Sequence, residues 1–166
     1  MSTSDDPVML SAPQPELRIE VRRYDDPVVT ELVAQLQQIF VQRYGSPDQA
    51  VVDPAEFSPP NGLFLVGFVG EDAVASGGWR RLDEQTAEIK RMYVAERMQR
   101  RGLSRLMLAA LEQAAGAAGV SELVLNTGVE QPEAIALYLS SGYREIPGFG
   151  YYANHAGAHF YGKTID

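Results

Sequence analysis

The stretch Gln99-Arg100-Arg101-Gly102-Leu103-Ser104-Arg105 lies between two segments of different periodicity. The run before it, Ala87–Val94, is short, largely apolar and typical of a β-strand. After it, apolar residues recur at helical spacing from Leu103 to Ala114, and Gly119 ends that pattern. The sequence therefore predicts a strand, a short basic loop and the N-terminus of a helix.

This arrangement favours the binding of an anion. The first backbone N–H groups of a helix have no intrahelical partner and carry partial positive charge. Gly102 has no side chain to hold a ligand away from them, and Arg100, Arg101 and Arg105 add charge. We expect a phosphate or pyrophosphate here. The sequence contains neither the P-loop pattern nor a dinucleotide-binding glycine fingerprint after an early strand.

Further motifs follow in a fixed order around this loop. Glu88-Ile-Lys-Arg-Met-Tyr-Val94 precedes it, and Ala134-Ile-Ala-Leu-Tyr138 and Gly142-Tyr143 come after it. From about residue 63 to residue 146, the chain resembles the GNAT superfamily of acetyl-CoA-dependent N-acyltransferases. The resemblance implies a GNAT acyl-CoA N-acyltransferase fold of the α+β class. In that fold a mixed, mostly antiparallel twisted sheet has a splayed central strand pair and carries helices on both faces.

The hydrophobic pattern agrees with that architecture. We expect strands at residues 16–24, 63–70, 73–82, 86–95, 122–126, 143–146 and 157–165, and helices beginning at Pro27, after Gly102 and at Pro132. In the Thr86–Ala95 strand, Ile89 lies in one phase and Met92 and Val94 in the other, which predicts a β-bulge.

The resemblance also implies a binding site for acetyl-CoA, with the loop amides around its pyrophosphate. Ser104 stands where the family usually has glycine or alanine, and Gln131 where an asparagine often opens the last helix. The residues expected to contact acetyl-CoA are Met92, Tyr93, Val94, Gln99, Arg100, Arg101, Gly102, Leu103, Ser104, Arg105, Asn126 and Gln131.

Two side chains are candidates for proton transfer. Glu88 matches the position of the general base in some relatives. The alternatives are that Glu88 is a surface strand residue or a structural partner of Lys90 or Arg91, and that another residue or ordered water is the base. Tyr138 matches the family's general acid, and its phenol is close in basicity to a thiolate; the alternative is a core tyrosine.

The chain has no cysteine, which disfavours a thiol acyl-enzyme and favours direct attack in a ternary complex. A backbone N–H near Tyr93 or Val94 would polarise the thioester carbonyl. The expected function is acetyl transfer from acetyl-CoA to a primary amine of a small molecule or protein. A non-catalytic acyl-CoA-binding module is the alternative.

The acceptor is less well determined. Tyr44, Glu56 and Phe57 flank a proline-rich loop that covers the acceptor site in the family, whereas Arg80 or Arg81 would suit a substrate carboxylate. Trp79 is expected in the core. His155 and His159 have no neighbouring carboxylates in the sequence, so we expect no metal.

Composition limits the class of protein. At 166 residues we expect a polar lead over residues 1–15 and one domain over residues 16–166. The net charge of −8 argues against a nucleic-acid partner. The sequence shows no signal peptide and no apolar run that could span a membrane, so the expected location is the cytoplasm. The sequence does not exclude a homodimer.

Overall fold

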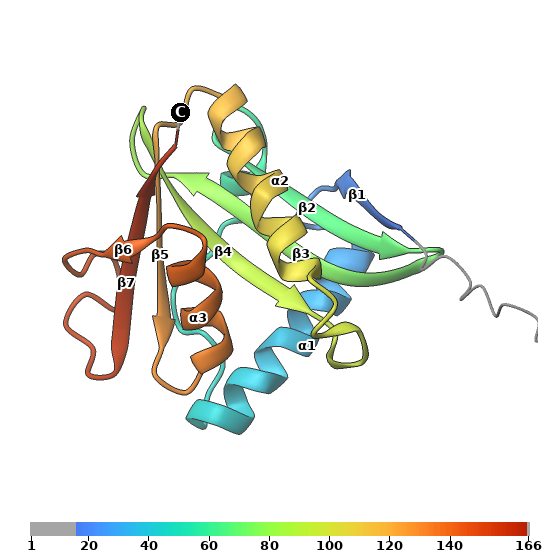
Figure 1. Ribbon diagram of the computed structural model, residues 1–166, viewed down its shortest axis with the longest axis horizontal. Coiled ribbons are helices and arrows are strands. Elements are labelled where there is room, and N and C mark those ends of the chain that lie inside the picture. The colour runs from blue at the N-terminus through green and yellow to red at the C-terminus, as the bar shows by residue number, and fades with distance from the viewer. Residues whose placement is uncertain (1–15, 166) are drawn as a thin grey trace, which may run out of the picture.

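The computed structural model describes residues 16–165, which form one seven-stranded sheet with helices on both faces (Figure 1). The predicted lead over residues 1–15 lies outside this range. In chain order the elements are β1 (Leu17–Val21), α1 (Pro27–Tyr44), the 3₁₀ turn η1 (Pro54–Phe57), β2 (Gly62–Val69), β3 (Asp72–Arg81), β4 (Thr86–Val94), η2 (Glu96–Met98), α2 (Leu103–Ala117), β5 (Glu122–Gly128), α3 (Pro132–Ser140), β6 (Arg144–Glu145) and β7 (Ala158–Thr164).

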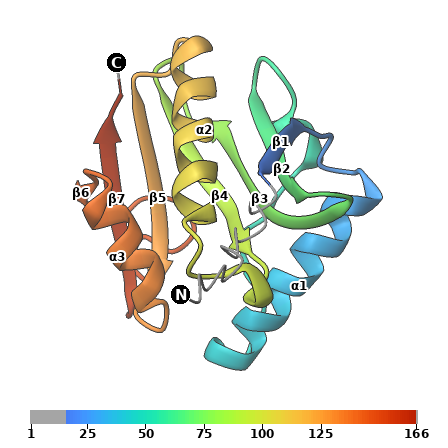
Figure 2. The same ribbon diagram turned by 45° about the vertical axis from the view of Figure 1, so that its right-hand side comes forward.

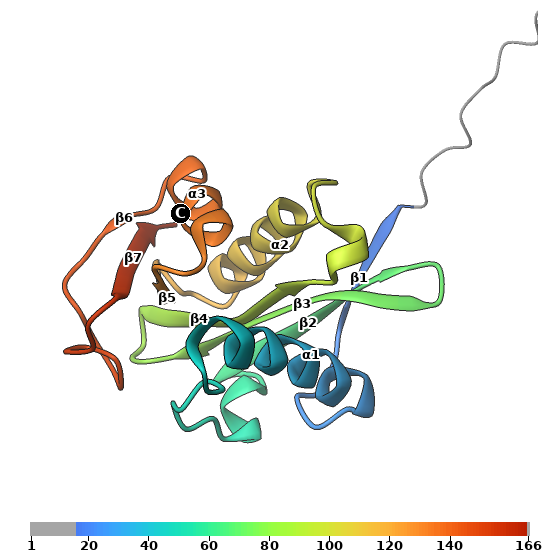
Figure 3. The same ribbon diagram turned by 90° about the horizontal axis from the view of Figure 1, so that it is seen from below.

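The strand order is β1-β2-β3-β4-β5-β7-β6, and every neighbouring pair is antiparallel except β4 and β5. Helix α1 covers one face, and α2 and α3 cover the other (Figure 3). The larger core lies beneath α2, where Met107 and Leu111 are fully buried. A smaller core around Phe57 and Phe64 lies on the α1 face. The predicted mixed, mostly antiparallel fold is confirmed.

Local signals in the sequence position α1. Asp26 is the N-cap, its carboxylate accepts a 2.9 Å hydrogen bond from the N–H of Val28, and Pro27 occupies the first turn. The helix ends at Gly45, which adopts the left-handed conformation at φ +82°. The start at Pro27 was predicted. The position of α1 matters because its C-terminal end lies against the end of β5.

The central pair of strands separates early. The parallel ladder between β4 and β5 has three residue pairs and ends where Glu88 lies opposite Val124. Beyond that point the two strands diverge, and the N-terminus of α2 lies over the wide end of the gap (Figure 2). The splayed pair implied by the family resemblance is therefore present.

A β-bulge in β4 accompanies this separation. Ser76 lies opposite Tyr93 and Gly78 opposite Lys90, so β4 has one more residue than β3 over this span. The extra residue is at Arg91, whose φ is +62°. The predicted bulge is confirmed.

Some boundaries differ from expectation. The first strand is shorter than predicted: it ends at Val21, and one further backbone bond, from the Arg22 N–H to the Phe64 carbonyl of β2 at 3.0 Å, follows before the N-cap of α1. The sixth strand has two residues instead of four. The turn η2 was not predicted, because three residues carry too little periodicity to show a helix.

Candidate active site

The N-terminus of α2 has free hydrogen-bond donors. Gly102 is its N-cap at φ +77°, no described side chain caps it, and its first turn has no acidic residue. The first intrahelical bond joins the Leu106 N–H to the Gly102 carbonyl at 3.2 Å. The N–H groups of residues 103–105 therefore have no intrahelical acceptor. A Cβ built on Gly102 meets no atom within 4 Å, so the approach is open.

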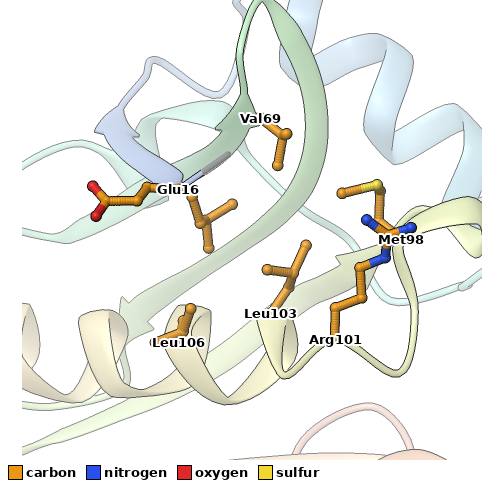
Figure 4. A pocket seen from close by; sticks show the side chains of 7 residues that line it. Glu16, Val69, Met98, Arg101, Leu103 and Leu106 are labelled. Carbon is orange, nitrogen blue, oxygen red and sulfur yellow. The ribbon is translucent and has the colours of Figure 1, made fainter. Parts of the chain in front are cut away.

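The three arginines near this helix end have different surroundings. Arg105 donates from Nη2 to Ser140 Oγ at 2.7 Å and so connects α2 to the end of α3. Arg101 lines a pocket of about 350 Å³ on the β1 side of α2, with Met98 and Leu106 (Figure 4). Arg100 is exposed and has φ +64°. Arg100 and Arg101 are both exposed, and neither side chain makes a hydrogen bond within residues 16–165, so both are available to an incoming phosphate.

The edge of β4 that faces the gap presents a backbone donor. The Ala95 N–H bonds the Val74 carbonyl of β3 at 2.8 Å. Because backbone groups alternate in direction along a strand, those of Val94 face the gap. Gln99 Nε2 donates to the Val94 carbonyl at 3.1 Å, which leaves the Val94 N–H as the donor at this edge.

The side chains of Met92 and Tyr93 point away from this edge. Met92 packs toward α2, near Gly77 and Leu111. Tyr93 lies on the α1 face, where its hydroxyl donates to Gln35 Oε1 at 2.8 Å, and burial raises its pKa. These side chains therefore do not line the gap.

The two coenzyme contacts predicted beyond the loop lie nearer to α1. Asn126 alternates with the core residue Leu125 and so shares the α1 face of β5 with Gly128. Gln131 is the N-cap of α3, and its Nε2 donates to the Tyr44 hydroxyl at 3.3 Å. Contact of Asn126 and Gln131 with acetyl-CoA stays a prediction.

Tyr138 is buried on α3 beside the gap. Its ring meets Tyr143 edge to face, with 5.5 Å between centroids. Burial raises its pKa well above the ordinary value, which keeps the phenol protonated. Within residues 16–165 its hydroxyl makes no hydrogen bond, in contrast to Tyr143, which donates to Glu112 at 3.4 Å. Tyr138 thus combines a core position with an unused donor.

Glu88 is paired, but with a different residue from those expected. Its Oε1 accepts hydrogen bonds of 3.0 Å from Nε and Nη2 of Arg80. Of the alternatives to the role of base, a pairing with Lys90 or Arg91 is not observed, because the register of β3 and β4 places Arg80 directly opposite Glu88. Among the described residues, Oε2 of Glu88 accepts no hydrogen bond. That oxygen is free to take a proton.

A second group of charges follows on the same strand. Lys90 Nζ and Arg91 Nη1 lie 3.1 Å and 2.7 Å from the same oxygen, Oδ2 of Asp48. The other oxygen, Oδ1, accepts from the Tyr152 hydroxyl at 2.7 Å and from the Ala50 N–H at 3.0 Å. Asp48 and Tyr152 could not be identified from the sequence, because they lie in loops far from β4 along the chain.

The remaining acceptor-side candidates have structural contacts. Phe57 is in the smaller core, Glu56 pairs with Arg80 at 3.2 Å, and Tyr44 lies against Gly128. Arg81 donates to the carbonyls of Pro60, Glu84 and Ala118. Trp79 is buried in the larger core, as predicted.

Residues 16–165 contain no group of three or more His, Cys, Asp or Glu side chains that would hold a metal ion. No helix among them is both long and apolar enough to cross a membrane.

Comparison with known proteins decides the family. The family model described as "Acetyltransferase (GNAT) family" matches residues 30–143. The chain belongs to the GNAT acetyltransferase family. This acetyltransferase is 32% identical over 132 residues to a protein named IAA acetyltransferase from Azospirillum brasilense, covering 75% of this chain and 82% of the relative.

Solved structures agree with the fold of this GNAT acetyltransferase. A Klebsiella pneumoniae protein classed with the acyl-CoA N-acyltransferases superposes with a TM-score of 0.78 at 25% identity, over 92% of this chain and 99% of that one. A GNAT acetyltransferase from Elizabethkingia anophelis, solved with acetyl-CoA bound, has a TM-score of 0.66 at 15% identity, over 90% and 98% of the two chains. As a family member, this acetyltransferase uses acetyl-CoA as its co-substrate.

Proposed function

We propose that this acetyltransferase transfers the acetyl group of acetyl-CoA to a primary amine of a small molecule or protein by direct attack in a ternary complex. The observation that carries the proposal is the gap between β4 and β5, which opens beside the uncapped N-terminus of α2. In this proposal the extended thioester arm lies along the diverging strands, and the helix end supplies donors for its pyrophosphate.

The residues around the gap fit the coenzyme. The free N–H groups of Leu103, Ser104 and Arg105 would hold the pyrophosphate, and Arg100 would add charge. Gly102 leaves room for this approach. The Val94 N–H, at the edge facing the gap, is the donor for the thioester carbonyl or the pantetheine amide.

The transfer needs two proton movements. The neutral amine attacks the thioester carbonyl, the N–C bond forms, and the C–S bond breaks. The amine proton passes to Glu88 Oε2, directly or through water, since that oxygen lies on the α1 face of β4, where we place the acceptor. The departing thiolate takes the phenol proton of Tyr138, which the solvent then replaces. Burial keeps the phenol of Tyr138 protonated until the thiolate departs, but it also disfavours the phenolate that donation leaves.

The charge of the chain supports the remaining part of the proposal. A net charge of −8 disfavours nucleic acid as a partner. We place the enzyme in the cytoplasm, where acetyl-CoA is available to it.

The test is release of free thiol from acetyl-CoA across a panel of amines. A thiol reagent reports only coenzyme A here, because the protein has no cysteine. Tyr138→Phe should lower kcat by about 10²- to 10⁴-fold with a much smaller change in KM for acetyl-CoA. Tyr143→Phe is the matched control, since the two rings are neighbours and both are buried.

Full activity of Tyr138→Phe would show that another group protonates the thiolate. Tight binding of acetyl-CoA without turnover on any amine would indicate a non-catalytic acyl-CoA-binding module instead.

A further inference from the structure

The α1 face of β3 and β4 carries two charged groups of opposite net charge. In the first, Lys90 and Arg91 share the single carboxylate of Asp48, which leaves one positive charge in excess. In the second, the guanidinium of Arg80 is shared by two carboxylates, Glu88 and Glu56, which leaves one negative charge in excess. The two groups form a dipolar surface.

The two charged groups lie close together, near the place where β4 and β5 separate. Glu88 and Lys90 are two residues apart on β4 and share a face, so their backbones are about 7 Å apart. Glu88 is also the last β4 residue that pairs with β5. The dipolar surface therefore begins where the gap between the strands opens, at the place where the acetyl group must meet its acceptor.

Burial makes the positive excess significant. The Lys90 and Arg91 side chains are 6% and 5% exposed, and Asp48 is 10% exposed. One buried carboxylate does not balance two buried cations, and an unbalanced charge away from water is costly. Lys90 has three N–H donors but, within residues 16–165, one ionic contact, at 3.1 Å. An anionic ligand would complete this group.

Asp48 also connects this group to two surface segments. Through Oδ1, Asp48 also holds Tyr152, which belongs to the segment between β6 and β7, and Tyr152 in turn accepts the Gln49 N–H at 2.8 Å. Two surface segments are thus joined over Lys90 and Arg91 by one carboxylate. A ligand carboxylate suits this group beside Asp48, because it brings the missing negative charge together with two acceptor oxygens.

We propose that the acceptor is a small amino-carboxylate, bound with its carboxylate at Lys90 and Arg91 and its amine at Glu88. The proposal rests on the acetyl transfer to an amine proposed above and names the substrate class for it. It also places the substrate carboxylate at Lys90 and Arg91 instead of at Arg80 or Arg81, which were considered from the sequence. Arg80 and Arg81 are already bonded to Glu88, Glu56 and backbone carbonyls, whereas Lys90 and Arg91 carry the unbalanced charge.

The experiment compares matched acceptors: phenylalanine with phenylalanine amide and phenethylamine, and γ-aminobutyrate with butylamine. The measurement is kcat/KM from thiol release at saturating acetyl-CoA. We expect each amino-carboxylate to exceed its uncharged or decarboxylated analogue by about 10²- to 10⁴-fold, because an analogue that lacks the group leaves buried donors unpaired. In parallel, calorimetry measures binding of the same compounds to the complex with coenzyme A.

The variant Lys90→Met then tests whether Lys90 and Arg91 cause the preference for a carboxylate. The substitution leaves Arg91 and Asp48 as a balanced pair, so the preference for the carboxylate should fall at least about tenfold while acetylation of phenethylamine persists. The control is Lys163→Met, which removes the only other lysine; Lys163 pairs with Glu112 under α2, on the opposite face.

Equal or better use of the decarboxylated amines by the wild-type protein would overturn the inference and leave amine acetylation standing. Binding of an amino-carboxylate without turnover, abolished by Lys90→Met, would support the inference and contradict the proposed activity. If no compound is turned over and none binds, both the inference and the proposed activity are contradicted. If Lys90→Met does not fold, the wild-type comparison still decides.

Discussion

The hydroxyl of Ser76 donates a 2.8 Å hydrogen bond to the carbonyl of Arg91, and both residues are buried. Arg91 has φ +62°, a region that non-glycine residues rarely adopt and that costs energy. The Ser76 side chain on β3 thus satisfies the carbonyl at the bulge of β4. This bond supports the strand conformation that turns the Val94 N–H toward the gap.

Ser76→Ala should therefore weaken both the fold and coenzyme binding. Loss of the hydroxyl leaves a buried carbonyl without its donor, which costs about 1–3 kcal/mol and should lower Tm by several degrees. The dissociation constant for acetyl-CoA should rise, because the bulge becomes less rigid. Scanning calorimetry and titration calorimetry check the two effects. An unchanged Tm would show that another donor or water satisfies the Arg91 carbonyl.

Gly102→Val should prevent coenzyme binding, and the structure offers Gly119→Val as its control. The two glycines lie beyond opposite ends of α2, both have positive φ, and a Cβ at either meets no atom within 4 Å. Both substitutions place a β-branched residue in a strained conformation, so the losses of Tm should be similar. Only the side chain at position 102 lies beside the free N–H donors. Titration of both variants with acetyl-CoA separates strain from obstruction, and equal affinities would contradict the assignment of the loop.

Glu88→Gln should change the pH–rate profile rather than coenzyme affinity. The amide keeps the size of the side chain and can still accept from Arg80, but it cannot take a proton. The acidic limb of kcat/KM should therefore shift or flatten. Glu56→Gln is the control, because Glu56 contacts the same guanidinium at 3.2 Å. A profile identical to the wild type would transfer the role of base to ordered water.

The bond between Tyr152 and Asp48 should give a pH-dependent stability at alkaline pH. Burial and the bond to Asp48 raise the pKa of Tyr152 to about 12, above the 10.0 of an unperturbed phenol. A group whose pKa is raised by folding stabilises the native state fully below its unfolded pKa. That contribution is then lost as the pH rises from about 10 to about 12.

The measurement is the free energy of unfolding of the wild type and Tyr152→Phe between pH 7 and 11.5. The wild type should be more stable by about 1–2 kcal/mol at neutral pH, and the difference should shrink above pH 10. Tyr151→Phe, at a neighbouring exposed tyrosine, should match the wild type at neutral pH. A difference that is constant up to pH 11.5 would contradict this account.

Much of the architecture was predictable because its signals are local. The caps of α1 at Asp26 and Gly45 and the free helix end at Gly102 depend on residues within one turn of each other. The phase change between Ile89 and Met92 likewise predicts a bulge that the register of β3 and β4 confirms. The ordered motifs around the loop then indicated the GNAT family, which the family model confirms.

The acceptor side could not be predicted in this way, because it is assembled from segments far apart along the chain. Asp48 reaches Lys90, Arg91 and Tyr152 across separations of more than 40 residues, and no local pattern marks such contacts. The partner of Glu88 could not be found for the same reason: neighbours along β4 were considered as alternatives, whereas the register with β3 places Arg80 opposite Glu88. The sequence by itself determined most of the elements, the uncapped N-terminus of α2 and the family. Only the tertiary structure decided which charges meet on the acceptor face, since long-range pairing depends on strand register and loop closure rather than on local propensity.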